Sequence, residues 1–128
     1  MRARRGDQGG ASVELVLVTP LVMLLIAVAI QFALYYHASN IATAAAQDGV
    51  RAAQVEHGSG ADGAARARVV ADRAGSVLEG VSIDASRGER RVRVEVSGSV
   101  VSFVPGLHLT LTRSAEGSVE QFLPPDQR

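Results

Sequence analysis

Residues 15–36 read LVLVTPLVMLLIAVAIQFALYY, and none of these side chains carries a charge at neutral pH. Because an α-helix rises about 1.5 Å per residue, this stretch is long enough to cross a hydrocarbon core of about 30 Å. Pro20 is expected to bend the helix slightly, which membrane helices tolerate. Tyr35 and Tyr36 fall where an aromatic belt meets the membrane surface. The sequence therefore predicts one transmembrane helix.

Charge on either side of this segment predicts its orientation. Arg2, Arg4 and Arg5 precede the apolar run, whereas the first arginine after it is Arg51. Basic residues flanking a membrane helix are retained on the cytoplasmic side. We therefore expect a single-pass protein of the cell membrane, with a cytoplasmic N-terminus and an extracytoplasmic C-terminal domain.

The composition excludes several classes of function. The chain has 128 residues and a formal net charge of zero, so it has no excess of basic side chains that would attract nucleic acid. It also has no cysteine, which excludes disulfides, thiolate metal ligands and cysteine nucleophiles. His37, His57 and His108 lie far apart and show no ligand spacing, and no catalytic motif accompanies them. We expect no enzyme activity, no cofactor, no metal site and no nucleic-acid partner.

The residues before the membrane segment carry the most specific pattern. Residues 4–15 read RRGDQGGASVEL, in which a basic leader ends in glycine and a glutamate stands before the apolar run. A cut between Gly9 and Gly10 would make Glu14 the fifth residue of the mature chain, and glycine allows the extended backbone that a protease cleft requires. Alternatively, Glu14 complements the helix dipole and the glycines form a linker. Both interpretations remain open on spacing alone.

A longer stretch resembles a known family. The string GGASVELVLVTPLVMLL, followed by QFALYY and an alanine-rich segment, is similar to the TadE-like proteins, which are pseudopilins of the tight-adherence (Flp-type) system. The resemblance implies that an aspartyl prepilin peptidase cuts after Gly9, and that Gly10 becomes the first mature residue. It also implies that Glu14 pairs with the α-amine of a neighbouring pilin. A competing cut after Gly10 would place Glu14 at position four.

Two departures from the major Flp pilin favour a minor pseudopilin. Leu15 follows the glutamate where that pilin often has an aromatic residue, and the exported part is longer. We expect a hetero-oligomer with other Tad or Flp pilins, in contact with the lipid bilayer and the prepilin peptidase. The alternatives are an uncleaved, signal-anchored binding or scaffold protein, and a secreted protein released after the A-x-A-like site at residues 42–44.

The remaining residues predict an α+β, pilin-like fold. The long helix is expected to cover residues 10–57, with alanine-rich faces suited to contacts between subunits, and residues 58–60 should stop it. A second helix is expected over residues 61–78, ended by Gly80.

Alternating apolar residues then predict a three-stranded antiparallel sheet, with strands over residues 81–85, 91–97 and 107–112. Residues 105–106 should form a tight turn, and the hairpin of the last two strands should pack on the second helix. In this division residues 1–9 are the leader, residues 58–122 the extracytoplasmic domain and residues 123–128 a flexible tail.

Overall fold

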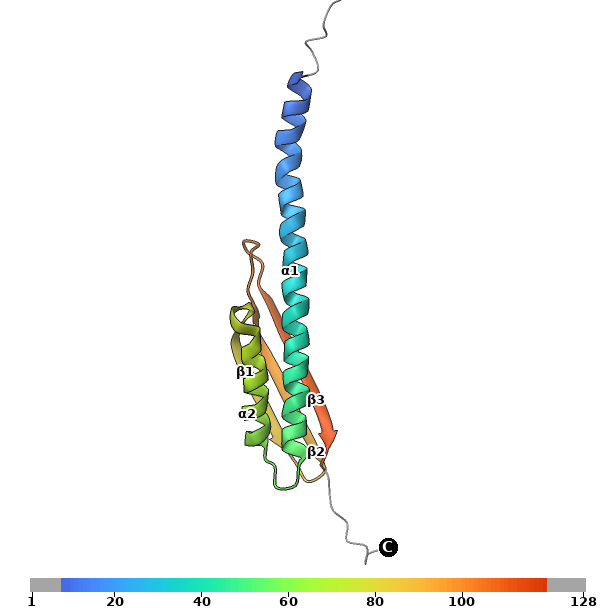
Figure 1. Ribbon diagram of the computed structural model, residues 1–128, viewed down its shortest axis with the longest axis vertical. Helices are drawn as coiled ribbons and strands as arrows, with labels where there is room; N and C mark the ends of the chain where they lie inside the picture. Colours follow the sequence, from blue (N-terminus) through green and yellow to red (C-terminus); the bar gives the residue numbers. More distant parts are fainter. Residues whose placement is uncertain (1–7, 120–128) are drawn as a thin grey trace, which may run out of the picture.

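The computed structural model describes residues 8–119 and shows a long helix, a short helix and a three-stranded antiparallel sheet (Figure 1). The α+β, pilin-like fold is therefore confirmed. The arginine-rich leader up to residue 7 and the tail at residues 123–128 lie outside the described residues. In chain order the elements are α1 (Gln8–Gln54), α2 (Gly60–Ala71), the 3-10 helix η1 (Asp72–Val77), β1 (Leu78–Arg87), β2 (Arg91–Val100) and β3 (Leu109–Ser118).

The two halves of α1 have different surroundings. Its N-terminal half projects alone, whereas its C-terminal half packs against α2 and the sheet (Figure 1). The buried side chains of that half are small and recur at helical spacing, as in Ala38, Ala42, Ala45, Ala46 and Ala53. This face was expected to serve contacts between subunits, and the structure corrects that expectation. It is covered within the chain, where small side chains let the sheet and α2 approach closely.

The sheet has the strand order β1-β2-β3 and turns one face toward the helices. Val92, Val94 and Val96 of β2 are fully buried on that face, and burying one such side chain contributes at least about 1.5 kcal/mol. β2 and β3 pack mainly on α1, whereas α2 packs mainly on α1 and, among the strands, on β1. The prediction that the β2–β3 hairpin packs on the second helix is therefore wrong, because the alanine-rich face of α1 already occupies that position.

The break between the helices differs from the prediction. α1 ends at Gln54 rather than residue 57, and Ser59 caps α2 instead of only stopping α1. The Ser59 hydroxyl accepts a hydrogen bond from the Asp62 N–H at 3.1 Å, and the Ser59 N–H donates to the Asp62 carboxylate at 2.8 Å. This reciprocal pair is a capping box, which satisfies donors at the helix start.

The second helix also stops earlier than expected. Its regular part ends at Ala71, and Gly75 interrupts the following 3-10 turn with a φ of 55°. Gly80, expected to end the helix, instead lies inside β1 with a φ of 59°, beside the irregular pairing between Glu79 and Ser82. Positive φ at both positions is readily adopted only by glycine.

All three strands are longer than their apolar alternation predicts, and β2 continues to Val100 rather than residue 97. β1 covers Leu78–Arg87, and β3 begins at Leu109 rather than residue 107 and continues to Ser118. The helix-facing positions in the second half of β3 are Arg113, Ala115 and Gly117, so that segment has little apolar periodicity. Its pairing with the valine-rich β2 determines its structure instead.

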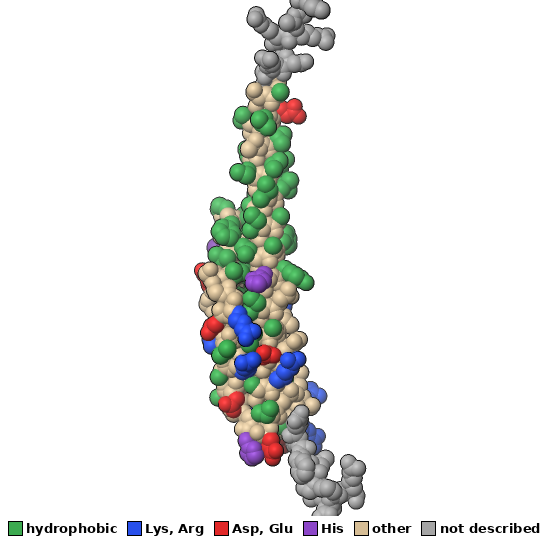
Figure 2. All heavy atoms as spheres, viewed as in Figure 1, with side chains coloured by type: hydrophobic (Ala, Val, Ile, Leu, Met, Phe, Trp, Pro, Cys, Tyr) green, Lys and Arg blue, Asp and Glu red, His purple; other side chains and the backbone are tan. Residues whose placement is uncertain are grey.

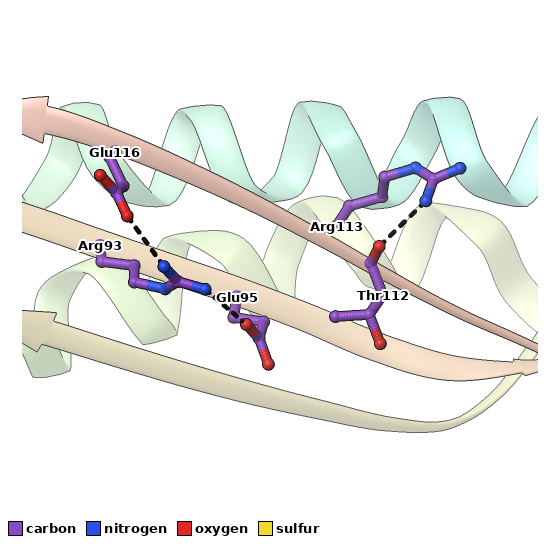
Figure 3. A network of polar contacts seen from close by, with 5 residues as sticks. All are labelled: Arg93, Glu95, Thr112, Arg113 and Glu116. Atoms are coloured by element: carbon purple, nitrogen blue, oxygen red, sulfur yellow. Dashed lines mark hydrogen bonds and ion pairs between the residues drawn. The ribbon is translucent and has the colours of Figure 1, made fainter.

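Charged side chains couple the strands to each other and to α1 (Figure 3). On the outer face, the Arg93 guanidinium lies 3.1 Å from Glu95 and 2.9 Å from the cross-strand partner Glu116. These hydrogen bonds, the one to Glu95 first, raise the pKa of Arg93 above its ordinary value. Arg113 points toward α1, where its Nε donates to the Ser39 hydroxyl at 2.9 Å.

Candidate functional site

The projecting half of α1 exposes large apolar side chains on every side. Leu15, Val16 and Leu17 are exposed by 67%, 70% and 71%, and side chains between residues 10 and 30 remain exposed except for the half-buried Ala27. Figure 2 shows this apolar surface over the upper part of the molecule, with charged groups gathered below. Contiguous apolar surface of this extent marks contact with a membrane or a partner.

α1 has the length and composition to cross a membrane, and within residues 8–119 it is the one helix that does. The most apolar stretch of α1 is not buried inside the protein at all, whereas the core helix of a soluble protein is mostly buried. α1 is therefore a candidate membrane anchor, in agreement with a single-pass protein.

Gly9, Gly10 and Glu14 occupy the start of this helix. α1 begins at Gln8, so both glycines have helical backbone rather than the extended backbone expected at a cleavage site. A Cβ at Gly10 would meet nothing within 4 Å, and the Glu14 side chain is exposed. Gly10 and Glu14 are therefore both exposed, about one helical turn apart.

Pro20 lies inside α1 without ending it. Proline removes one backbone donor and leaves an unpaired carbonyl one turn earlier. The hydroxyl of the preceding Thr19 donates to the Leu15 carbonyl at 2.7 Å. The carbonyl that Pro20 leaves without its helical donor is that of Val16, four residues earlier, so the Thr19 bond adds to the helix without replacing the lost one.

Gln31 is a feature that the sequence reasoning missed. Its side chain is only 2% exposed, although it lies within the predicted transmembrane segment. Its Nε2 donates to the Val101 carbonyl at 3.0 Å, and its Oε1 accepts from the Phe103 N–H at 3.0 Å. The sequence could have indicated a special role for this residue, because Gln31 is the one polar side chain in residues 21–34.

The loop that Gln31 binds, residues 101–108 between β2 and β3, runs beside α1 toward the projecting half (Figure 1). Phe103 at its tip is exposed by 66%. Behind the tip, Leu107 and Leu109 line an apolar cavity of about 240 Å³ together with side chains of α1: Val28, Gln31, Phe32 and Tyr35. The last residues of the predicted span, 31–36, are therefore partly covered by the chain's own loop.

Side chains outside this region that could bind a metal ion are not grouped into a site within residues 8–119. Over residues 8–119 no group of three His, Cys, Asp or Glu side chains is placed to hold a metal ion. His37, His57 and His108 are each exposed and come from three different segments. His57 follows α1 with a φ of 65°, the left-handed conformation that commonly ends a helix.

Comparison with known proteins agrees with the position of the apolar segment and of the residues before it. Residues 9–51 match the family model of the TadE-like proteins, a stretch that covers both glycines, Glu14, the apolar segment and most of the buried alanine face. No curated protein and no solved structure matches the chain. The resemblance seen in the sequence is thereby confirmed over residues 9–51, a stretch within α1 that is similar to the TadE-like proteins.

Proposed function

We propose that this protein is a non-enzymatic minor pseudopilin that takes part in assembling a Flp-type (Tad) pilus or secretion pseudopilus. In this proposal α1 anchors the chain in the cell membrane, with residues before Gly10 in the cytoplasm and the α+β domain outside. A prepilin peptidase removes the leader after Gly9. The mature chain then joins other Tad or Flp pilins in a hetero-oligomer.

One observation carries this proposal, namely an apolar helix that is exposed on all sides and continues into a small packed domain. A core helix would be covered by its own chain, and a flexible tail would carry no folded domain at its end. A helix of this kind can leave the bilayer only if other apolar helices replace the lipid around it. Because residues 9–51 match the family model of the TadE-like proteins, we expect these partner helices to belong to other pilins.

Glu14 has the position that a pairing role requires. It is exposed, and from residue 15 to residue 47 no Asp, Glu, Lys or Arg follows it. A carboxylate at the edge of the hydrocarbon core is costly unless a cation pairs with it. The α-amine formed by cleavage after Gly9 would supply such a cation in a neighbouring subunit.

An uncleaved, signal-anchored scaffold protein is the second candidate. The helical backbone of Gly9 and Gly10 favours it, because a scissile bond must leave the helix before a protease can bind it. Each glycine costs the helix about 1 kcal/mol relative to alanine, so unwinding this first turn needs little free energy. The helical start therefore opposes cleavage only slightly.

Co-isolation with other pilins tests the pairing role of Glu14. Glu14→Ala and Glu14→Gln should enter the membrane normally but lose most of the partner pilins that the wild-type chain retains. Glu56→Ala is the matched control, because it removes an exposed carboxylate just beyond the opposite end of α1. Unchanged co-isolation of the Glu14 variants would show that this carboxylate does not pair subunits.

A further inference from the structure

The loop of residues 101–108 lies at a depth that the bilayer reaches. Counting about 20 residues from Leu15, the hydrocarbon core ends near Leu34. Gln31 is then three residues, or about 4.5 Å, inside that boundary. Since the Gln31 side chain binds the backbone of Val101 and Phe103 at 3.0 Å, the tip of the loop lies at the same depth.

The loop also has the composition of a membrane contact. Its residues read VSFVPGLH, and no Asp, Glu, Lys or Arg occurs from residue 96 to residue 112. The uncharged surface of α1 therefore continues onto the loop without interruption (Figure 2). Polar groups at the base of the loop, among them Glu79 and His108, line a shallow hollow where lipid headgroups and water would lie.

Several backbone groups of the loop are paired inside the protein. The Val104 N–H donates to the Ser102 hydroxyl at 3.2 Å, and the same hydroxyl donates to the Val104 carbonyl at 3.0 Å. The Leu107 N–H donates to that carbonyl at 3.1 Å, while Gln31 satisfies Phe103 and Val101. Pairing of this kind lowers the cost of bringing non-helical backbone into a bilayer. The carbonyls of Phe103, Pro105 and Gly106 accept no hydrogen bond within residues 8–119, and they would meet water or lipid headgroups at the membrane surface.

We propose that residues 101–108 form a second membrane contact, which enters the leaflet on the side of the α+β domain and exposes Phe103 to phospholipid acyl chains. The proposal rests on the membrane insertion of α1 and holds for either orientation of the chain. Gln31 acts as the clamp that fixes the loop to the anchor. Anchor and loop together hold the protein against the bilayer at two points, which restricts its tilt and its rotation about the axis of α1.

Tryptophan fluorescence tests this contact directly, because the chain contains no tryptophan of its own. Three full-length single-tryptophan variants are placed in phosphatidylcholine nanodiscs at one chain per disc, with and without bromine on the acyl chains. Phe103→Trp reports on the loop, Leu24→Trp on the anchor, and Val69→Trp on an exposed apolar position of α2. Bromine quenches only tryptophan that touches the acyl chains.

We expect Phe103→Trp and Leu24→Trp to lose most of their emission in brominated discs, and Val69→Trp to keep its emission. Quenching of Leu24→Trp alone would overturn the loop contact and leave the anchor intact. A blue-shifted Phe103→Trp emission that bromine does not reduce would show that the chain's own residues, rather than lipid, cover this side chain, and would overturn the loop contact. If Leu24→Trp is not quenched either, both the anchor and the loop contact are wrong.

Discussion

Gly49 of α1 and Gly63 of α2 face each other so closely that a Cβ on either glycine would lie 2.8 Å from the carbonyl oxygen of the other. The two helix backbones are therefore in direct contact at this crossing. Ala53 and Ala67 complete the contact, with a Cβ on Gly63 falling 3.0 Å from the first and a Cβ on Gly49 falling 3.1 Å from the second. This crossing joins the anchor helix to the domain.

Gly49→Ala and Gly63→Ala should each lower the free energy of unfolding. Overpacking costs about 1–3 kcal/mol, which outweighs the roughly 1 kcal/mol that alanine adds to a helix. Thermal unfolding of the detergent-solubilised protein, followed by circular dichroism, measures the change. Gly88→Ala is the control, because a Cβ there would come no closer than 3.7 Å to its nearest neighbour. Wild-type midpoints for both helix variants would show that the crossing is loose.

Gln31→Leu should release the loop of residues 101–108 from α1. The substitution leaves the part-buried Val101 carbonyl and Phe103 N–H without their partner, and losing a hydrogen bond of this kind costs about 1 kcal/mol. Hydrogen exchange of the Phe103 amide should accelerate accordingly. Gln47→Leu changes an exposed glutamine on the same helix and should leave that amide unaffected. Equal exchange in both variants would refute the clamp.

Ser59→Ala should destabilise α2 by about 1 kcal/mol, the usual effect of losing a helix cap. Exchange rates of the amides at the start of α2 report this loss. Ser76→Ala, at an exposed position of η1, provides the matched control. Similar exchange in the two variants would mean that the cap contributes little.

Stability at acid pH depends on the same cap. The Ser59 hydroxyl and N–H hold the pKa of the Asp62 carboxyl below its ordinary value of 3.8. Because the folded-state pKa is lowered, the contribution of Asp62 is complete above the unfolded value and disappears as pH falls through the folded one. Asp62→Asn should therefore weaken the dependence of the free energy of unfolding on pH in the acid range below about pH 5. An unchanged pH dependence would exclude Asp62 as its source.

The parts of the fold that follow from local patterns could be predicted from the sequence. The apolar run at residues 15–36 predicts a helix by length alone, and the alternation of Val92, Val94 and Val96 predicts a strand. The Ser59–Asp62 spacing is also typical of a capping box, although residues 58–60 were expected only to end the long helix.

Features that depend on tertiary contacts could not be predicted in this way. The second half of β3 follows the pairing of Arg113 and Ala115 with β2, which leaves no periodic pattern of its own. Gln31 binds a loop 72 residues away, and nothing in the local sequence specifies that partner. The alanine-rich face of α1 shows that something packs closely against it, but it does not distinguish a second subunit from the chain's own sheet. The local sequence therefore predicts which face of a helix is buried, but it does not predict which element or subunit covers that face.

Gly9→Val should leave the leader attached while membrane insertion continues. The bulkier side chain would prevent the close approach of a peptidase to the backbone that glycine allows, whereas the apolar segment is unchanged. The intact mass of the membrane-extracted variant measures this effect. Normal trimming of Gly9→Val would count strongly against cleavage at this bond by a prepilin peptidase.

The N-terminal residue of the wild-type protein, extracted from the membranes of a cell that carries the complete Tad system, tests the proposed function most directly. A processed pseudopilin begins at Gly10, with Glu14 as its fifth residue. A mature chain that retains its arginine-rich leader, or one that begins after Ala44, would contradict the account.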